Sequence, residues 1–200
     1  MLTYCKTLLR RFRREDEGSM LVEAVIILPT LFAAVLATFV FFDAYRNQAI
    51  TIKANYTIAD AVSRESGYIT NTYMINTWTL HKLLTNSDNL TQLRVSVIEY
   101  DSDTDKHTVI WSRAKGGGLA YDDVAISVIG LSANDVPVLP DSEILIVVQT
   151  SVDYEPDFSI GLGAFTFANT TFTRPRWAGR NLCYSQNDTA SGAICPGFSS

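Results

Sequence analysis

The chain has 200 residues, of which 47% are apolar and 18% charged, and its mean hydropathy is +0.10. This composition excludes a disordered tail and a collagen-like repeat, and the net charge of -5 argues against a nucleic-acid-binding body. The charge is unevenly distributed, because residues 1–18 hold five basic and three acidic side chains while the rest holds 11 basic and 18 acidic ones. A basic N-terminus therefore precedes an acidic body.

A run of 19 residues without a charge, residues 24–42, follows the basic segment. As a helix it would measure roughly 28 Å, the thickness of a bilayer's hydrocarbon core. Pro29 lies inside the run, where a membrane helix tolerates it. A cleaved secretory signal is the alternative, but its apolar region would end after about 7 to 15 residues. We therefore predict one transmembrane helix over residues 19–43, with the basic N-terminus on the cytoplasmic side.

Glu23 lies one residue before this run and is the most informative side chain of the segment. A lone carboxylate at the edge of the hydrocarbon is costly unless a partner neutralises it, so such acids are functional candidates. The alternative is an ordinary interfacial glutamate whose carboxylate reaches the headgroups.

The spacing around Glu23 resembles a known family. Gly18 is followed by Ser19, Glu23 is the fifth residue counted from Ser19, and Pro29 is the eleventh. A basic stretch, this spacing and an apolar helix together resemble the processing site of type IV prepilins. The stretch from Glu23 to Pro29 is more similar to the TadE-like minor pseudopilins of the tight-adherence (Flp) pilus system, and the resemblance covers residues 10–66. Ser19 stands where the best-known type IV pilins have Phe, which favours the Flp branch.

The resemblance implies that a membrane-embedded prepilin peptidase cleaves between Gly18 and Ser19 and removes a cytoplasmic leader, residues 1–18. Gly18 has no Cβ and can be held extended in a protease groove. Glu23 would then pair with the N-terminal ammonium of a neighbouring subunit in the helical core of the assembly.

The implied partners are other pilin subunits, contacted through the N-terminal helix, the prepilin peptidase and the inner-membrane assembly platform. The implied location is the bacterial inner membrane, with a periplasmic head and incorporation into an extracellular pilus for adhesion. The alternative function is an unprocessed, bitopic, membrane-anchored periplasmic binding module.

Residues 44–66 are predicted to continue the membrane helix into the periplasm, because apolar residues recur at intervals of three and four. Gly67 marks the predicted stop. The residues of this apolar stripe are Ala49, Ile52, Tyr56, Ala59 and Val62.

The remaining residues, 67–200, predict an α+β head with an antiparallel sheet, since helical signals come first and strand signals later. Alternating residues around an acidic turn are typical of a β-hairpin, and two later runs read as further strands. Residues 119–138 are ambiguous, with a possible short helix. The predicted elements are a helix over 73–84, a hairpin of 93–97 with 108–113, and strands over 144–154 and 165–173.

The three cysteines divide according to this topology. Cys5 lies in the leader, whereas Cys183 and Cys195 lie in the exported region, where an oxidising compartment permits a bridge. We predict a Cys183–Cys195 disulfide, with two unpaired thiols as the alternative.

The sequence predicts no catalytic, cofactor-binding or metal site, so we expect neither an enzyme nor a small-molecule substrate. The two histidines, His81 and His107, have no Cys or acid at metal-ligand spacing. The Asp101, Asp103 and Asp105 series lacks the glycine and glutamate of a calcium loop, and a solvated turn is the better interpretation than weak calcium binding. The remaining basic cluster, read as a solvated strand end, is Arg174, Arg176 and Arg180.

Overall fold

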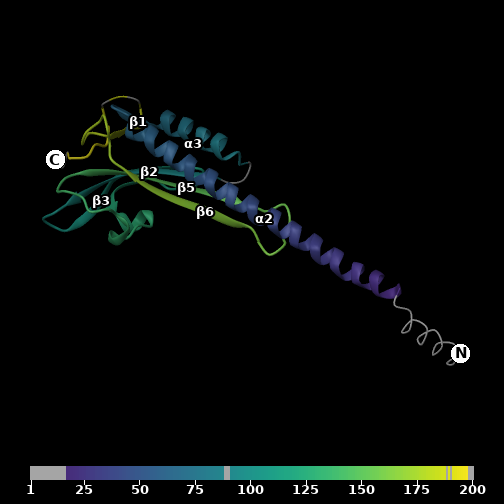
Figure 1. The fold of residues 1–200 in the computed structure, drawn as a ribbon. Coiled ribbons are helices and arrows are strands. Elements are labelled where there is room, and N and C mark those ends of the chain that lie inside the picture. Colours follow the sequence, from purple (N-terminus) through teal and green to yellow (C-terminus); the bar gives the residue numbers. More distant parts are fainter. Residues whose placement is uncertain (1–16, 88–90, 188, 190, 198–200) are drawn as a thin grey trace. The chain divides into compact units, whose positions relative to one another are not determined.

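The computed structural model describes residues 17–87, 91–187, 189 and 191–197, and the fold is α+β: a long N-terminal apolar helix followed by an antiparallel sheet (Figure 1). The predicted fold class is confirmed. The chain divides into two compact units. The membrane-helix unit comprises the described part of Met1–Ala44 together with Pro156–Gly163, and the head unit comprises Tyr45–Glu155 with Ala164–Ser200.

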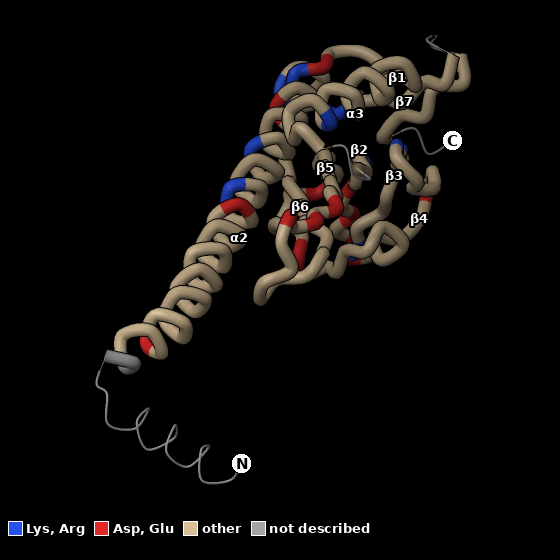
Figure 2. Tube along the Cα trace, turned by 90° about the vertical axis from the view of Figure 1, so that its right-hand side faces the viewer, with Lys and Arg blue, Asp and Glu red and all other residues tan. Residues whose placement is uncertain are grey.

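Helix α2 runs without interruption over Glu17–Ser63, and it is long and apolar enough to cross a membrane. Figure 2 shows a long charge-free stretch in its first half. Pro29 lies inside the helix without ending it. The predicted transmembrane segment and its extension are thus one helix, which begins two residues before Ser19. The leader up to residue 16, with Cys5, lies outside the described residues.

The head is built on a five-stranded antiparallel sheet in the order β4-β3-β2-β5-β6. The predicted hairpin, the two later strands and the second helix are all confirmed. The strands are β2 (Thr91–Asp101), β3 (Lys106–Lys115), β4 (Tyr121–Ala125), β5 (Ile144–Tyr154) and β6 (Phe165–Thr173), and the helix is α3 (Asn71–Thr85).

Both faces of this sheet are covered, which explains the continuous apolar run in β5. Ile144, Ile146 and Val148 face a core formed with α2 and α3, while Leu145 and Val147 face a second core. The second core is closed by the segment after β4, which contains the short 3-10 helices η1 (Ile126–Ile129) and η2 (Ala133–Asp135). Alternate residues of a strand point to opposite faces, so a doubly covered strand is apolar throughout.

Two short strands are absent from the sequence prediction. β1 (Tyr68–Thr70) and β7 (Cys183–Ser185) pair in parallel in a separate sheet. Three residues carry too little periodicity to be recognised in a sequence. β4 lies in the segment over 119–138 that the sequence left ambiguous, because its Asp122 and Asp123 are poor strand formers.

The second half of α2 buries a different face from the predicted apolar stripe. Ala59 and Val62 are buried as expected, but Tyr56 is 61% exposed, and Asn55 is buried in its place. The reason is a specific hydrogen bond, because the Asn55 Nδ2 donates to the Thr171 hydroxyl of β6 at 3.1 Å. This bond satisfies the NH2 group of the amide, whereas the buried Asn55 Oδ1 has no hydrogen-bond partner among the described residues.

Helix α3 begins and ends with recognisable caps. The Thr70 hydroxyl accepts a hydrogen bond from the Tyr73 N–H, and the helix ends at Asn86 in the left-handed conformation, whose N–H donates to the Leu83 carbonyl. In its middle, His81 is completely buried, and neither ring nitrogen has a hydrogen-bond partner among the described residues. Burial lowers the pKa of His81 to about 4.

We expect His81 to make the head sensitive to acid. Above pH 6.5 the imidazole is neutral in both states, but between pH 6.5 and 4 the unfolded chain binds a proton that the folded chain does not, so stability falls as pH falls. The loss over this window is about 3 kcal/mol. It can be measured by urea denaturation of the full chain in detergent at pH 7 and at pH 4.

The matched control is His81→Leu, which keeps a similar volume and cannot titrate. All other titrating groups contribute equally to both chains, so the difference between their stabilities isolates His81. A difference that does not change from pH 7 to pH 4 would contradict the prediction.

Candidate functional site

The predicted site residues Gly18, Ser19, Glu23 and Pro29 all lie in the first turns of α2. The Gly18–Ser19 peptide bond belongs to the first turn, where N–H groups have no partner inside the helix and the ends fray. Glycine also lowers helix stability by roughly 1 kcal/mol relative to alanine. The bond is therefore in the part of α2 that opens most easily into the extended form that a protease binds.

Glu23 is exposed on the helix surface at the start of the apolar run. It makes no ion pair with any residue whose side chain the structure describes. Its neighbours along the helix are apolar, including Met20 and Ile27, both of which are exposed. A carboxylate in this setting requires a positive partner from outside its own helix if it is to enter a low-dielectric environment.

The side-chain hydroxyls of the apolar run are hydrogen-bonded within the helix, whereas one backbone carbonyl loses its usual donor. Pro29 has no N–H, so the Val25 carbonyl receives no helical hydrogen bond from it. The Thr30 hydroxyl donates to the Ile26 carbonyl at 2.8 Å, and the Thr38 hydroxyl donates to the Ala34 carbonyl at 2.9 Å. Hydroxyls bonded to the preceding turn are compatible with a lipid or a packed-helix environment. Glu23 is thus the polar side chain of this segment that still needs a partner.

The surface around these residues is continuously apolar, as expected for a helix that contacts lipid or other helices. Its exposed large side chains include aromatic as well as aliphatic residues. They are Met20, Leu21, Val22, Val25, Ile26, Ile27, Leu28, Leu31, Phe32, Val35, Phe39, Phe41 and Phe42.

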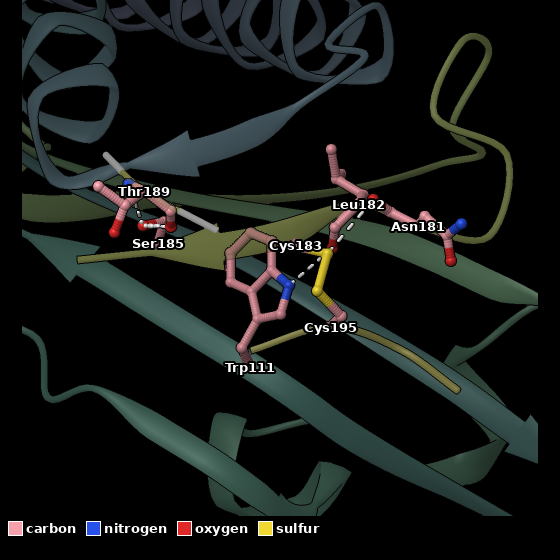
Figure 3. The surroundings of a disulfide bond; sticks show 7 residues. All are labelled: Trp111, Asn181, Leu182, Cys183, Ser185, Thr189 and Cys195. Carbon is pink, nitrogen blue, oxygen red and sulfur yellow. Dashed lines mark hydrogen bonds between the residues drawn. A yellow bond between two sulfur atoms is a disulfide. The ribbon is translucent and has the colours of Figure 1, made fainter. Parts of the chain in front are cut away.

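In the head unit, Cys183 and Cys195 form a disulfide with an S–S distance of 2.01 Å (Figure 3). The bridge closes a loop of 12 positions at the C-terminal end, which can contribute about 3 kcal/mol in the chain-entropy account. Trp111 of β3 lies beside it, and its indole Nε1 donates to the Leu182 carbonyl at 2.9 Å. The disulfide and this hydrogen bond together hold β7 against the core.

Three arginines were predicted to lie at a solvated strand end. Each of them forms an ion pair with a carboxylate, at N–O distances between 3.1 and 3.6 Å. Paired in this way, they do not form a free basic patch. The pairs are Arg174 with Glu143, Arg176 with Asp60 and Arg180 with Glu99.

The acidic segment after β2 is a turn closed by its own side chains. The Asp101 carboxylate accepts hydrogen bonds from the Thr104 hydroxyl and the Asp103 N–H, which lower the pKa of Asp101. The Tyr100 hydroxyl donates to Asp105. Within the described residues, no cluster of three or more His, Cys, Asp or Glu side chains could hold a metal ion.

Comparison of the chain with models of known families, with curated proteins and with solved structures gives no match. Fold and site together define an α+β head joined to a long apolar helix, near whose start Glu23 makes no ion pair with a described side chain.

Proposed function

We propose that the protein is a TadE-like minor pseudopilin of a tight-adherence (Flp) pilus, processed after Gly18 and assembled through α2. The observation that carries the proposal is the spacing of Gly18, Ser19, Glu23 and Pro29 at the start of a single helix that is long enough to span a bilayer. The proposed location is the bacterial inner membrane, with the N-terminus cytoplasmic and the head periplasmic, before entry into the pilus.

The geometry supports each step of this function. The proposed scissile bond lies in the fraying first turn of α2, where a peptidase needs to unwind little helix. Cleavage frees an ammonium on Ser19, and in a bundle of parallel helices the ammonium of one chain can neutralise Glu23 of the next. This pairing would determine the axial offset between neighbouring helices as well as their charge balance. The function is structural, so it requires no catalytic group in the head.

Processing can be tested by expressing the full chain with its cognate prepilin peptidase and measuring the intact mass and N-terminal sequence. We expect a chain that begins at Ser19 and lacks 18 residues. Gly18→Ala is expected to block cleavage, because a Cβ at this position would hinder binding of the extended chain in the protease groove.

The control is Gly67→Ala, since a Cβ on Gly67 meets nothing within 4 Å and the position is remote in sequence from the cleavage site. A natural chain that still begins at Met1 in the presence of active peptidase would refute processing. That result would favour the unprocessed, membrane-anchored binding module.

A further inference from the structure

The loop between β5 and β6, Pro156–Gly163, belongs to the same compact unit as the first part of α2. Its backbone approaches the helix closely, because a Cβ placed on Gly161 would lie 3.9 Å from the Phe41 Cε2. Gly161 has a φ of +77°, a conformation in which glycine is favoured. The loop is therefore packed beside the part of α2 that contains Phe41.

The position of Phe41 in α2 indicates the depth of this loop relative to a bilayer. It is the second-to-last residue of the charge-free run over 24–42, and Asp43 is the first charged residue after it. When a run of roughly 28 Å crosses a hydrocarbon core of about 30 Å, its last residues lie at the boundary with the headgroups. A loop beside Phe41 lies at that boundary too.

The composition of the loop suits this position. Phe158 is 46% exposed, Ile160 and Leu162 are partly exposed, and Asp157 is the one charged residue of the eight. The Ile160 N–H donates to the Phe158 carbonyl at 2.9 Å, which closes a tight turn at the apolar tip. Irregular backbone is excluded from hydrocarbon but is tolerated among headgroups, where an aromatic side chain is stabilised.

We propose that Pro156–Gly163 binds the surface of the phospholipid bilayer, with Phe158 inserted among the headgroups, as a second membrane contact besides α2. The inference rests on α2 spanning the bilayer, a part of the proposed function that the alternative binding module shares. Because the loop has no basic residue, its binding is apolar and does not require anionic lipid.

The test places a tryptophan in the loop, Phe158→Trp, in the full chain reconstituted into phosphatidylcholine vesicles. Lipids brominated on the upper part of their acyl chains quench tryptophan only at short range. We expect the fluorescence added by Phe158→Trp, relative to the natural chain, to be mostly lost with brominated lipid. Raising the salt concentration should leave this loss unchanged, since it does not depend on charge.

Two further variants separate the possible outcomes. Phe32→Trp lies in the apolar run and must be quenched if α2 spans the bilayer. Thr104→Trp lies in the β2–β3 turn, two residues after Ser102, whose N–H donates to the Asp141 carboxylate just before the start of β5. The loop, in contrast, follows the end of β5. An 11-residue strand separates these ends by roughly 36 Å, so Thr104→Trp tests whether quenching is confined to the loop.

Loss of fluorescence in the Phe158 and Phe32 variants, but not in the Thr104 variant, supports the proposal. Quenching of Phe32→Trp without quenching of Phe158→Trp overturns the loop contact and leaves the span intact, as would happen if a second copy covered the loop. Equal quenching of Thr104→Trp overturns it too, because the contact is then not local. An unquenched Phe32→Trp refutes the span itself.

Discussion

Replacing Glu23 with alanine is expected to remove the chain from assembled pili while leaving membrane insertion and cleavage intact. The Glu23 carboxylate at the start of the apolar run, which has no ion pair among the described side chains, would neutralise the Ser19 ammonium of a neighbouring subunit. Without it, that ammonium is left unpaired in a low-dielectric helix core, at a cost of about 3 to 5 kcal/mol. A penalty of this size corresponds to at least a hundredfold loss of incorporation. The measurement is the ratio of this chain in sheared pili to the chain in membranes.

Two companion variants identify the cause. Glu23→Gln preserves shape but not charge, so it should fail almost as completely as alanine if pairing with the ammonium is the reason. Thr38→Val removes a hydroxyl that bonds only to the Ala34 carbonyl of its own helix, so assembly should be unaffected. Normal incorporation of Glu23→Ala would contradict the pilin proposal and favour the membrane-anchored binding module.

The second large effect is expected for Trp111→Ala, which should destabilise the head by about 3 to 5 kcal/mol. Trp111 is completely buried in the core shared with α2 and α3, and its ring also packs against Tyr184 of β7 with centroids 5.7 Å apart. Its loss therefore creates a cavity and releases the hydrogen bond to Leu182. Urea denaturation of the full chain in detergent, followed by far-UV circular dichroism, measures the effect.

Trp111→Phe separates these two contributions, because it keeps most of the ring but leaves the Leu182 carbonyl unpaired, at about 1 to 3 kcal/mol. Trp177→Ala is the matched control, since Trp177 is 72% exposed and its removal should change stability by no more than about 0.5 kcal/mol. Equal stability of Trp111→Ala and Trp177→Ala would refute the assignment of Trp111 to this core.

Strong local patterns in the sequence predict the main elements. The charge-free run over 24–42 can be read as a helix because its length and composition match a bilayer, whatever the rest of the chain does. The hairpin of β2 and β3 follows from alternation around a turn, and β5 and β6 follow from strand-like runs bounded by turn residues. The spacing from Gly18 to Pro29 is local as well, so the residues of the candidate site can be recognised in the sequence alone.

Contacts between residues far apart in the sequence cannot be predicted from such local patterns. The stripe from Ala49 to Val62 only partly matches the buried face of α2, because buried Asn55 is hydrogen-bonded to Thr171, 116 positions away. The burial of His81 likewise follows from the packing of α3 and not from its neighbours in the sequence. The β1–β7 pair joins residues more than a hundred positions apart, and neither strand is long enough to show a period.

By itself, the sequence determined the order of the longer elements, the apolar helix that can cross a membrane and the spacing of Gly18, Glu23 and Pro29. These features depend on neighbouring residues and on transfer between water and lipid. Only the tertiary structure decided which face of α2 enters the head core, that β7 is held by Trp111 and the Cys183–Cys195 bridge, and that the Pro156–Gly163 loop lies beside Phe41. These features arise when segments far apart in the chain pack together, and the local periodicity of the sequence does not predict that packing.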